Sequence, residues 1–145
     1  MLSYGQQPKM CNYFPMPNEI FRLDLSDGAI LVYAFLMYCE DRKTYQCYPS
    51  YATIGKAIKR SENSVAKYVR ELEEKRLIYT EPTEVTLKDG RKHNGSLRYT
   101  IRPIAEAVEY AYEQQILRLQ AECRHQKVMQ KLQKTQGSIK KQEKA

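Results

Sequence analysis

The residues with the clearest chemistry lie on one predicted helix, at residues 61–75. Because an α-helix turns about 100° per residue, its apolar positions share one face. These positions are Val65, Val69 and Leu72. Asn63, Lys67 and Arg70 fall on the opposite face. An Asn amide pairs with adenine in the major groove, and Lys or Arg pairs with guanine or phosphate. The face is suited to duplex DNA, although a solvated helix face carries the same residue types.

Residues at the start of this helix extend the candidate surface. Ser61 and Ser64 can donate to phosphates beside the N-terminal amides of the helix. Lys59 and Arg60 form a tight turn just before it, and Ser50 caps the preceding helix. We therefore predict that all five residues contact DNA.

A second basic cluster lies between two alternating segments, near the turn dipeptides Asp89-Gly90 and Asn94-Gly95. Its predicted contact residues are Lys88, Arg91, Lys92, His93, Asn94 and Arg98. A hairpin of this composition can lie on a phosphate strand or send a cation into the minor groove. The alternative is an exposed loop that is charged for solubility. Because this basic cluster is close in sequence to the helix at 61–75, we expect the two to form one DNA-binding face.

Three serine-capped helices and a hairpin must position these side chains. Ser26 precedes a largely apolar helix at 27–40, Ser50 one at 51–58, and Ser61 the helix at 61–75. Residues 20–23 fit a short strand or one helical turn. Extended segments follow at 77–79, 85–87 and 97–101, and Pro82 marks an edge or bulged strand. A helical pattern then covers 104–133. The order predicts a mainly α fold with a small β-hairpin, a winged helix-turn-helix followed by a long C-terminal helix.

The segments Tyr48–Ile58 and Ser61–Ile78 carry a family resemblance. They are similar to the helix-turn-helix domains of replication-initiator and regulatory proteins of bacterial plasmids, phages and conjugative elements. The resemblance covers about residues 17–102. It implies double-stranded DNA binding through the helix at 61–75 and the wing, often as a dimer. The chain departs from the family pattern at two places. Arg76 stands where the family has Gly, so we expect a different turn at the end of the helix. Near the start of the helix, Glu62-Asn63 stands where the family has an arginine.

The 145 residues carry a formal charge of +7, which is distributed unevenly. Residues 1–48 hold 4 basic and 5 acidic side chains, residues 49–102 hold 12 and 7, and residues 103–145 hold 8 and 5. We predict an irregular arm at 1–17, the DNA-binding domain at 18–102, a helix at 103–135 and a disordered basic tail at 136–145. The basic middle segment is where an anionic partner is expected.

Several other functions are disfavoured by the sequence. No nucleophile elbow or Gly-rich phosphate loop is present, so we do not expect an enzyme. The four cysteines lack CxxC spacing, so we expect no metal, and we predict no cofactor or small-molecule ligand. The longest apolar run, residues 29–39, is too short to span a membrane. The first residues do not resemble a secretory signal, and we expect a cytoplasmic protein.

The sequence leaves open whether the partner of the winged helix is DNA or a protein, and it also bears on the oligomeric state. The winged helix could instead dock on a replication or transcription protein without reading DNA. Separately, Tyr112, Ile116, Leu119 and Cys123 have the 3–4 spacing of a partner helix, which predicts a homodimer through residues 104–123. The next two positions in this spacing, Gln126 and Gln130, are polar, so the apolar pattern ends there. The sequence does not separate transcription regulation from replication initiation.

Overall fold

The computed structural model of the protein describes residues 11–143, so most of the predicted arm lies outside the described part. The chain divides into two units, one that ends at Ala107 and one that begins at Val108. The first unit contains the 3-10 helix η1 (Asn18–Arg22) and the helices α1 (Asp27–Cys39), α2 (Tyr51–Ile58) and α3 (Glu62–Glu74). Helix α4 (Ile104–Glu143) begins in the first unit and makes up the described part of the second. Residues 11–17 carry no helix or strand.

Each of the three helices of the domain begins at a serine cap, as the sequence predicted. The hydroxyl oxygens of Ser26, Ser50 and Ser61 accept hydrogen bonds from the backbone N–H three residues later, at 3.3, 3.1 and 3.3 Å. A serine cap stabilises a helix by about 1 kcal/mol because it satisfies an amide that has no partner within the helix. The caps fix where α1, α2 and α3 begin.

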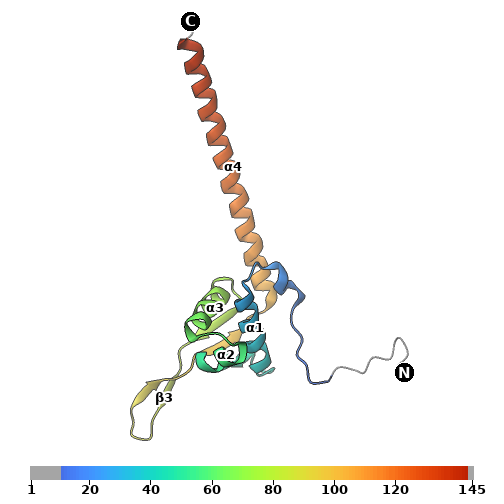
Figure 1. Cartoon of the computed structure of the whole chain (residues 1–145), viewed down its shortest axis with the longest axis vertical. Coiled ribbons are helices and arrows are strands. Elements are labelled where there is room, and N and C mark those ends of the chain that lie inside the picture. Colours follow the sequence, from blue (N-terminus) through green and yellow to red (C-terminus); the bar gives the residue numbers. More distant parts are fainter. Residues whose placement is uncertain (1–10, 144–145) are drawn as a thin grey trace, which may run out of the picture. The chain divides into compact units, whose positions relative to one another are not determined.

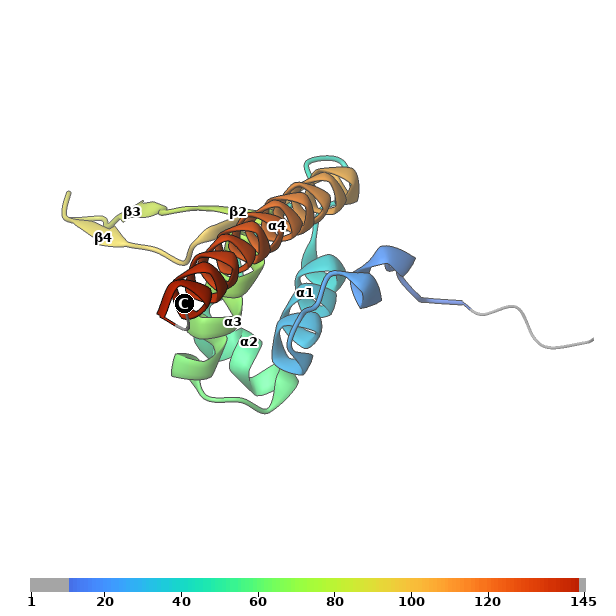
Figure 2. The same ribbon diagram turned by 90° about the horizontal axis from the view of Figure 1, so that it is seen from above.

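The core of the first unit lies where α1, α2 and α3 pack together against a small sheet (Figures 1 and 2). Its fully buried side chains include Val32, Leu36, Ile54, Leu72 and Tyr99. The close approach of α1 to α3 depends on Gly28, because a Cβ at this position would lie only 2.0 Å from the ring of Tyr68. Helix α1 is not buried all round, since Leu31 and Tyr38 are exposed.

The β-structure is larger than the single hairpin that the sequence predicted. Strands β1 (Gln46–Cys47), β5 (Arg98–Ile101) and β2 (Ile78–Glu81) form an antiparallel sheet in that order. Strand β1 was not among the extended segments that the sequence predicted. Strands β3 (Glu84–Thr86) and β4 (Lys92–Asn94) form a separate antiparallel pair. Pro82 separates β2 from β3, because proline has no N–H to donate to a strand ladder.

The turn after α3 keeps a glycine-like conformation although it contains Arg76. The φ angle of Arg76 is 59°, in the left-handed region. The Arg76 N–H donates to the Glu73 carbonyl and the Leu77 N–H to the Leu72 carbonyl, both at 3.0 Å. These two bonds are the pattern of a Schellman motif, which satisfies the last carbonyls of the helix. The expectation that Arg76 changes this turn was therefore wrong.

Helix α4 continues well beyond the predicted end at residue 135. Residues 136–143, which the sequence assigned to a disordered tail, are helical. Gly137 costs a helix interior only about 1 kcal/mol, and the Lys, Gln and Glu around it are good helix formers. No proline follows Pro103 to end the helix. Among residues 11–143, no helix is both long enough and apolar enough to cross a membrane.

Candidate nucleic-acid interface

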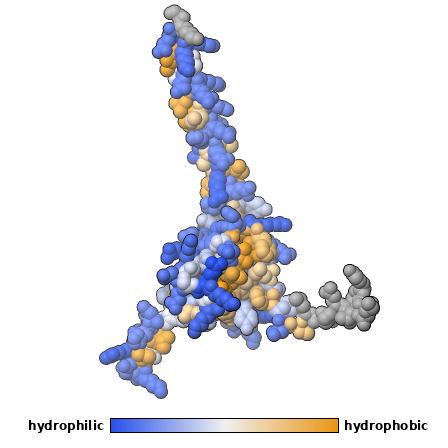
Figure 3. Space-filling view, in the orientation of Figure 1, coloured by the Kyte–Doolittle hydropathy of each residue, from blue (hydrophilic) through white to orange (hydrophobic). Residues whose placement is uncertain are grey.

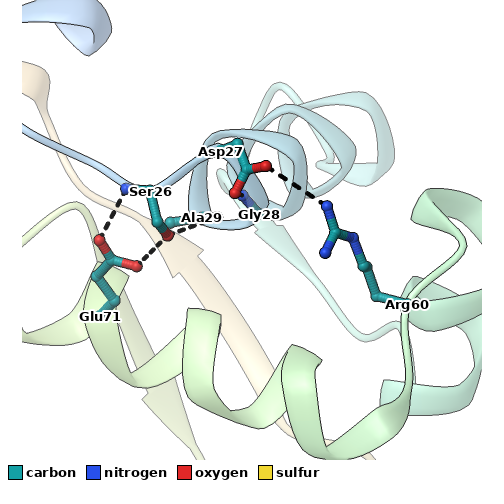
Figure 4. Close-up of polar contacts among 6 residues, drawn as sticks. All are labelled: Ser26, Asp27, Gly28, Ala29, Arg60 and Glu71. Carbon is teal, nitrogen blue, oxygen red and sulfur yellow. Dashed lines mark hydrogen bonds and ion pairs between the residues drawn. The ribbon is translucent and has the colours of Figure 1, made fainter.

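Two polar contacts fix α3 against the start of α1. The Glu71 carboxylate accepts from the backbone N–H of Ser26 at 3.0 Å and from its hydroxyl at 2.5 Å, as Figure 4 shows. One turn further along α3, the Lys75 ammonium donates to the backbone carbonyls of Leu23 and Asp24. These contacts hold one side of the helix toward the domain and leave the other side to solvent.

The outward face of α3 is the one that the sequence predicted. Asn63, Lys67 and Arg70 are exposed. The opposite stripe is buried, with Val65 and Leu72 at 0% exposure and Val69 at 3%. Glu74 is also exposed, near the C-terminal end of the helix. The structure thus presents an amide and two cations together on an uncovered helix face.

The serines at the helix starts have structural partners in addition to any DNA contact. Ser50 and Ser61 cap α2 and α3, and each lies beside a second hydroxyl, Thr53 Oγ1 at 2.9 Å or Ser64 Oγ at 3.0 Å. A hydroxyl that accepts a cap bond still has a proton to donate. Ser50, Ser61 and Ser64 therefore remain suitable phosphate donors.

The turn between α2 and α3 carries exposed cations. Lys59 has φ 57° and ψ 49°, and this left-handed conformation ends α2. The Arg60 guanidinium lies 3.5 Å from the Asp27 carboxylate, in the surface pair drawn in Figure 4. Lys56, on the last turn of α2, lines one shallow depression with Lys59, Arg60 and Ser61. Lys56 was not among the predicted contact residues, although its position three residues before Lys59 was an available signal.

The wing formed by β3 and β4 projects away from the helices (Figures 1 and 2). The predicted contact residues on it and its tip are all exposed; they are Lys88, Arg91, Lys92, His93 and Asn94. Two cations lie near acids: Lys92 is 3.7 Å from Glu84, and Arg91 is 3.9 Å from Asp89. Both pairs are largely exposed, so they hold their cations only weakly.

Arg98 lies apart from the exposed residues of the wing. It belongs to β5 in the three-stranded sheet, where it is opposite Glu81 and forms an ion pair with it. Its Nε atom is buried and has no hydrogen-bond partner among the described residues. The carboxylate of Glu81 therefore engages a cation that the sequence had assigned to DNA.

The start of α3 and the base of the wing border one hollow of about 510 Å³. Ser50 and Glu62 line it from the helices, and Asn94 and Ser96 line it from the wing. Tyr99 also lines it, and its buried hydroxyl has no partner in residues 11–143. Burial raises the pKa of Tyr99, so its hydroxyl stays protonated near neutral pH. Of the predicted contact residues, Ser50 and Asn94 line this hollow, one from each candidate cluster.

The sequence of this domain matches a known family over part of its length. Residues 23–78, which include α1, α2 and α3, match a family model described as a helix-turn-helix domain. None of the curated proteins compared with the chain matches it. With the wing in place, the elements define a winged helix-turn-helix protein with a long C-terminal helix.

Solved structures of regulators are distantly similar to the chain. A possible transcriptional regulator from Methanosarcina mazei Go1 is 19% identical, with 71% of this chain and 80% of that chain covered and a TM-score of 0.47. MepR, a transcription regulator of the Staphylococcus aureus multidrug efflux pump MepA, is 20% identical, with 83% and 84% covered and a TM-score of 0.37. The S. aureus MepR–DNA complex is 18% identical, with 79% and 86% covered and a TM-score of 0.37.

Proposed function

We propose that the protein binds double-stranded DNA, with α3 in the major groove and the wing on the backbone or in the minor groove. The observation that carries this proposal is the exposed face of Asn63, Lys67 and Arg70 on a helix held from behind by Glu71 and Lys75. A rigid helix with donors on its free side suits base edges and phosphates. The basic wing adds charge beside it.

The biological role follows from this activity. We propose that the protein regulates transcription or starts replication by occupying a DNA site, in a mobile element as the family resemblance implies. The DNA site would lie in the cytoplasm, which is where we expect the protein. A homodimer through α4 would let two domains bind two half-sites.

Salt-dependent binding to duplex DNA tests the proposal. Fluorescence anisotropy with a labelled random-sequence duplex would show affinity that falls steeply as salt rises, because each phosphate contact releases counterions. Lys67→Ala should weaken binding about tenfold, or about 1.4 kcal/mol. The matched control is Lys43→Ala, which removes an exposed lysine from the loop after α1. A lack of duplex binding at low salt would reject the proposal and favour docking on a protein partner.

A further inference from the structure

The hollow of about 510 Å³ that borders α2, α3 and the base of the wing contains a buried donor without a partner. Tyr99, on β5, lines this hollow although the residue is 0% exposed. Its hydroxyl has no hydrogen-bond partner in residues 11–143. A buried donor that has left water without finding an acceptor destabilises the fold, so such groups are few. A ligand that places an oxygen atom in the hollow would give Tyr99 the missing acceptor.

The rim of the hollow supplies further donors from two sides. Helix α2 begins at the rim, and the N–H groups of its first residues, Tyr51 and Ala52, have no partner within the helix. The Ser50 hydroxyl accepts the cap bond of α2 and keeps its proton to donate. The exposed Asn94 amide lies on the wing side. Because these donors converge at the positive end of a helix, the hollow is suited to an anionic oxygen ligand.

The shallow depression at the turn between α2 and α3 adjoins this hollow. Ala52 and Glu62 line both, so the two lie side by side along α2. The depression is lined by three exposed cations, which are Lys56, Lys59 and Arg60. Among residues 11–143, Glu62 is the only acid that lines either one, and it is exposed, so water and salt screen its charge. A site for hydrogen-bonded oxygens that continues into a row of cations suits an anionic chain better than a single small anion.

We infer that the hollow and the cationic depression form one track for the backbone of a single DNA strand. One phosphate lies in the hollow, where Tyr99, Ser50 and Asn94 donate to it, and a neighbouring phosphate lies beside Lys56 and Lys59. The inference rests on the proposed DNA binding, and it adds Tyr99 and Lys56 to the predicted contact residues. Phosphate contacts fix the position of a protein on a duplex without reading its sequence. The track therefore holds the wing and α3 in place while the outward face of α3 reaches the bases.

Removal of the Tyr99 hydroxyl should have opposite effects on stability and on DNA binding. Tyr99→Phe loses a donor that has no acceptor in the fold, so the variant should unfold at a higher urea concentration than the unchanged protein. It should bind duplex DNA about tenfold more weakly by fluorescence anisotropy, because a phosphate loses a hydrogen bond. The matched control is Tyr79→Phe on β2, where the residue is 53% exposed, and it should change neither quantity. A Tyr99→Phe variant with unchanged affinity, or with a urea midpoint no higher than before, would overturn the inference.

A scan of the DNA backbone tests the track itself. The probe is a duplex selected for binding, in which a neutral methylphosphonate replaces one phosphate at a time. One position should weaken binding of the unchanged protein about tenfold and binding of Tyr99→Phe far less, because the variant has already lost that contact. A neighbouring position on the same strand should show the same coupling with Lys56→Ala. Duplex binding without these coupled positions would reject the track alone, whereas no duplex binding even at low salt would reject the DNA-binding proposal as well.

Discussion

Glu71 on α3 and Ser26 at the start of α1 are joined by two hydrogen bonds, although they are 45 residues apart in the sequence. Ser26 also accepts from the Ala29 N–H, so one residue caps α1 and anchors α3 (Figure 4). The Glu71 carboxylate lies at the N-terminal end of α1, where the helix dipole favours a negative charge. This arrangement couples the start of one helix to the orientation of the other.

Removing this anchor should affect both stability and DNA binding. Glu71→Ala should lower the free energy of unfolding by about 1–2 kcal/mol, because the Ser26 donors lose a charged acceptor. Urea denaturation measures this loss, and anisotropy under folding conditions should show weaker duplex binding. Glu74→Ala is the matched control on the exposed side of α3, and its stability should change by less than about 0.5 kcal/mol. Equal stability of the two variants would contradict the anchoring role.

The features that the sequence predicted well depend on neighbours within a few residues. The caps at Ser26, Ser50 and Ser61, and the inward position of Val65 and Leu72, follow from local periodicity and hydrogen bonding. These local rules also placed Asn63, Lys67 and Arg70 on the free face of α3, so the exposed part of the candidate site was predictable.

The errors arose where distant residues decide the structure. Strand β1 exists because Gln46 and Cys47 pair with Thr100 and Tyr99, which nothing in residues 41–48 indicates. The pairing of Arg98 with Glu81 was not predicted for the same reason, since it depends on how β2 and β5 align. Strand register between segments far apart in the chain is set by the packed sheet as a whole.

Asn63 and Lys92 should have different effects on DNA binding if one reads bases and the other contacts phosphates. Asn63→Ala should change the preferred sequence in a selection from random duplexes, with about 1–3 kcal/mol lost at one position. Lys92→Ala should weaken all duplexes alike and reduce the salt slope by about 1. Glu84→Gln should strengthen binding, because it removes an acid 3.7 Å from Lys92. Equal effects of the first two variants on every duplex would refute this division of roles.

Arg76 gives a direct test of backbone strain at the end of α3. With φ at 59°, a residue with a Cβ is strained by about 1 kcal/mol relative to glycine. Arg76→Ala keeps this strain and removes the side chain, whereas Arg76→Gly removes both. The glycine variant should therefore be about 1 kcal/mol more stable than the alanine variant in urea denaturation. If alanine were as stable as glycine here, the left-handed conformation would be wrong.

The buried thiol of Cys47 should make the protein less stable in alkali. Burial raises the pKa of Cys47 to about 12, and its Sγ lies 3.7 Å from the Leu36 carbonyl. The unfolded thiol ionises near its ordinary pKa, so the unfolded state loses a proton that the folded state keeps. The contribution of the protonated Cys47 thiol to the free energy of unfolding is complete below about pH 8.5. It is lost as the pH rises toward 12, by up to about 1.4 kcal/mol per pH unit. Urea denaturation at pH 8, 9 and 10 should show this decline, and Cys47→Ala should flatten it. An unchanged slope in the variant would assign the decline to other groups.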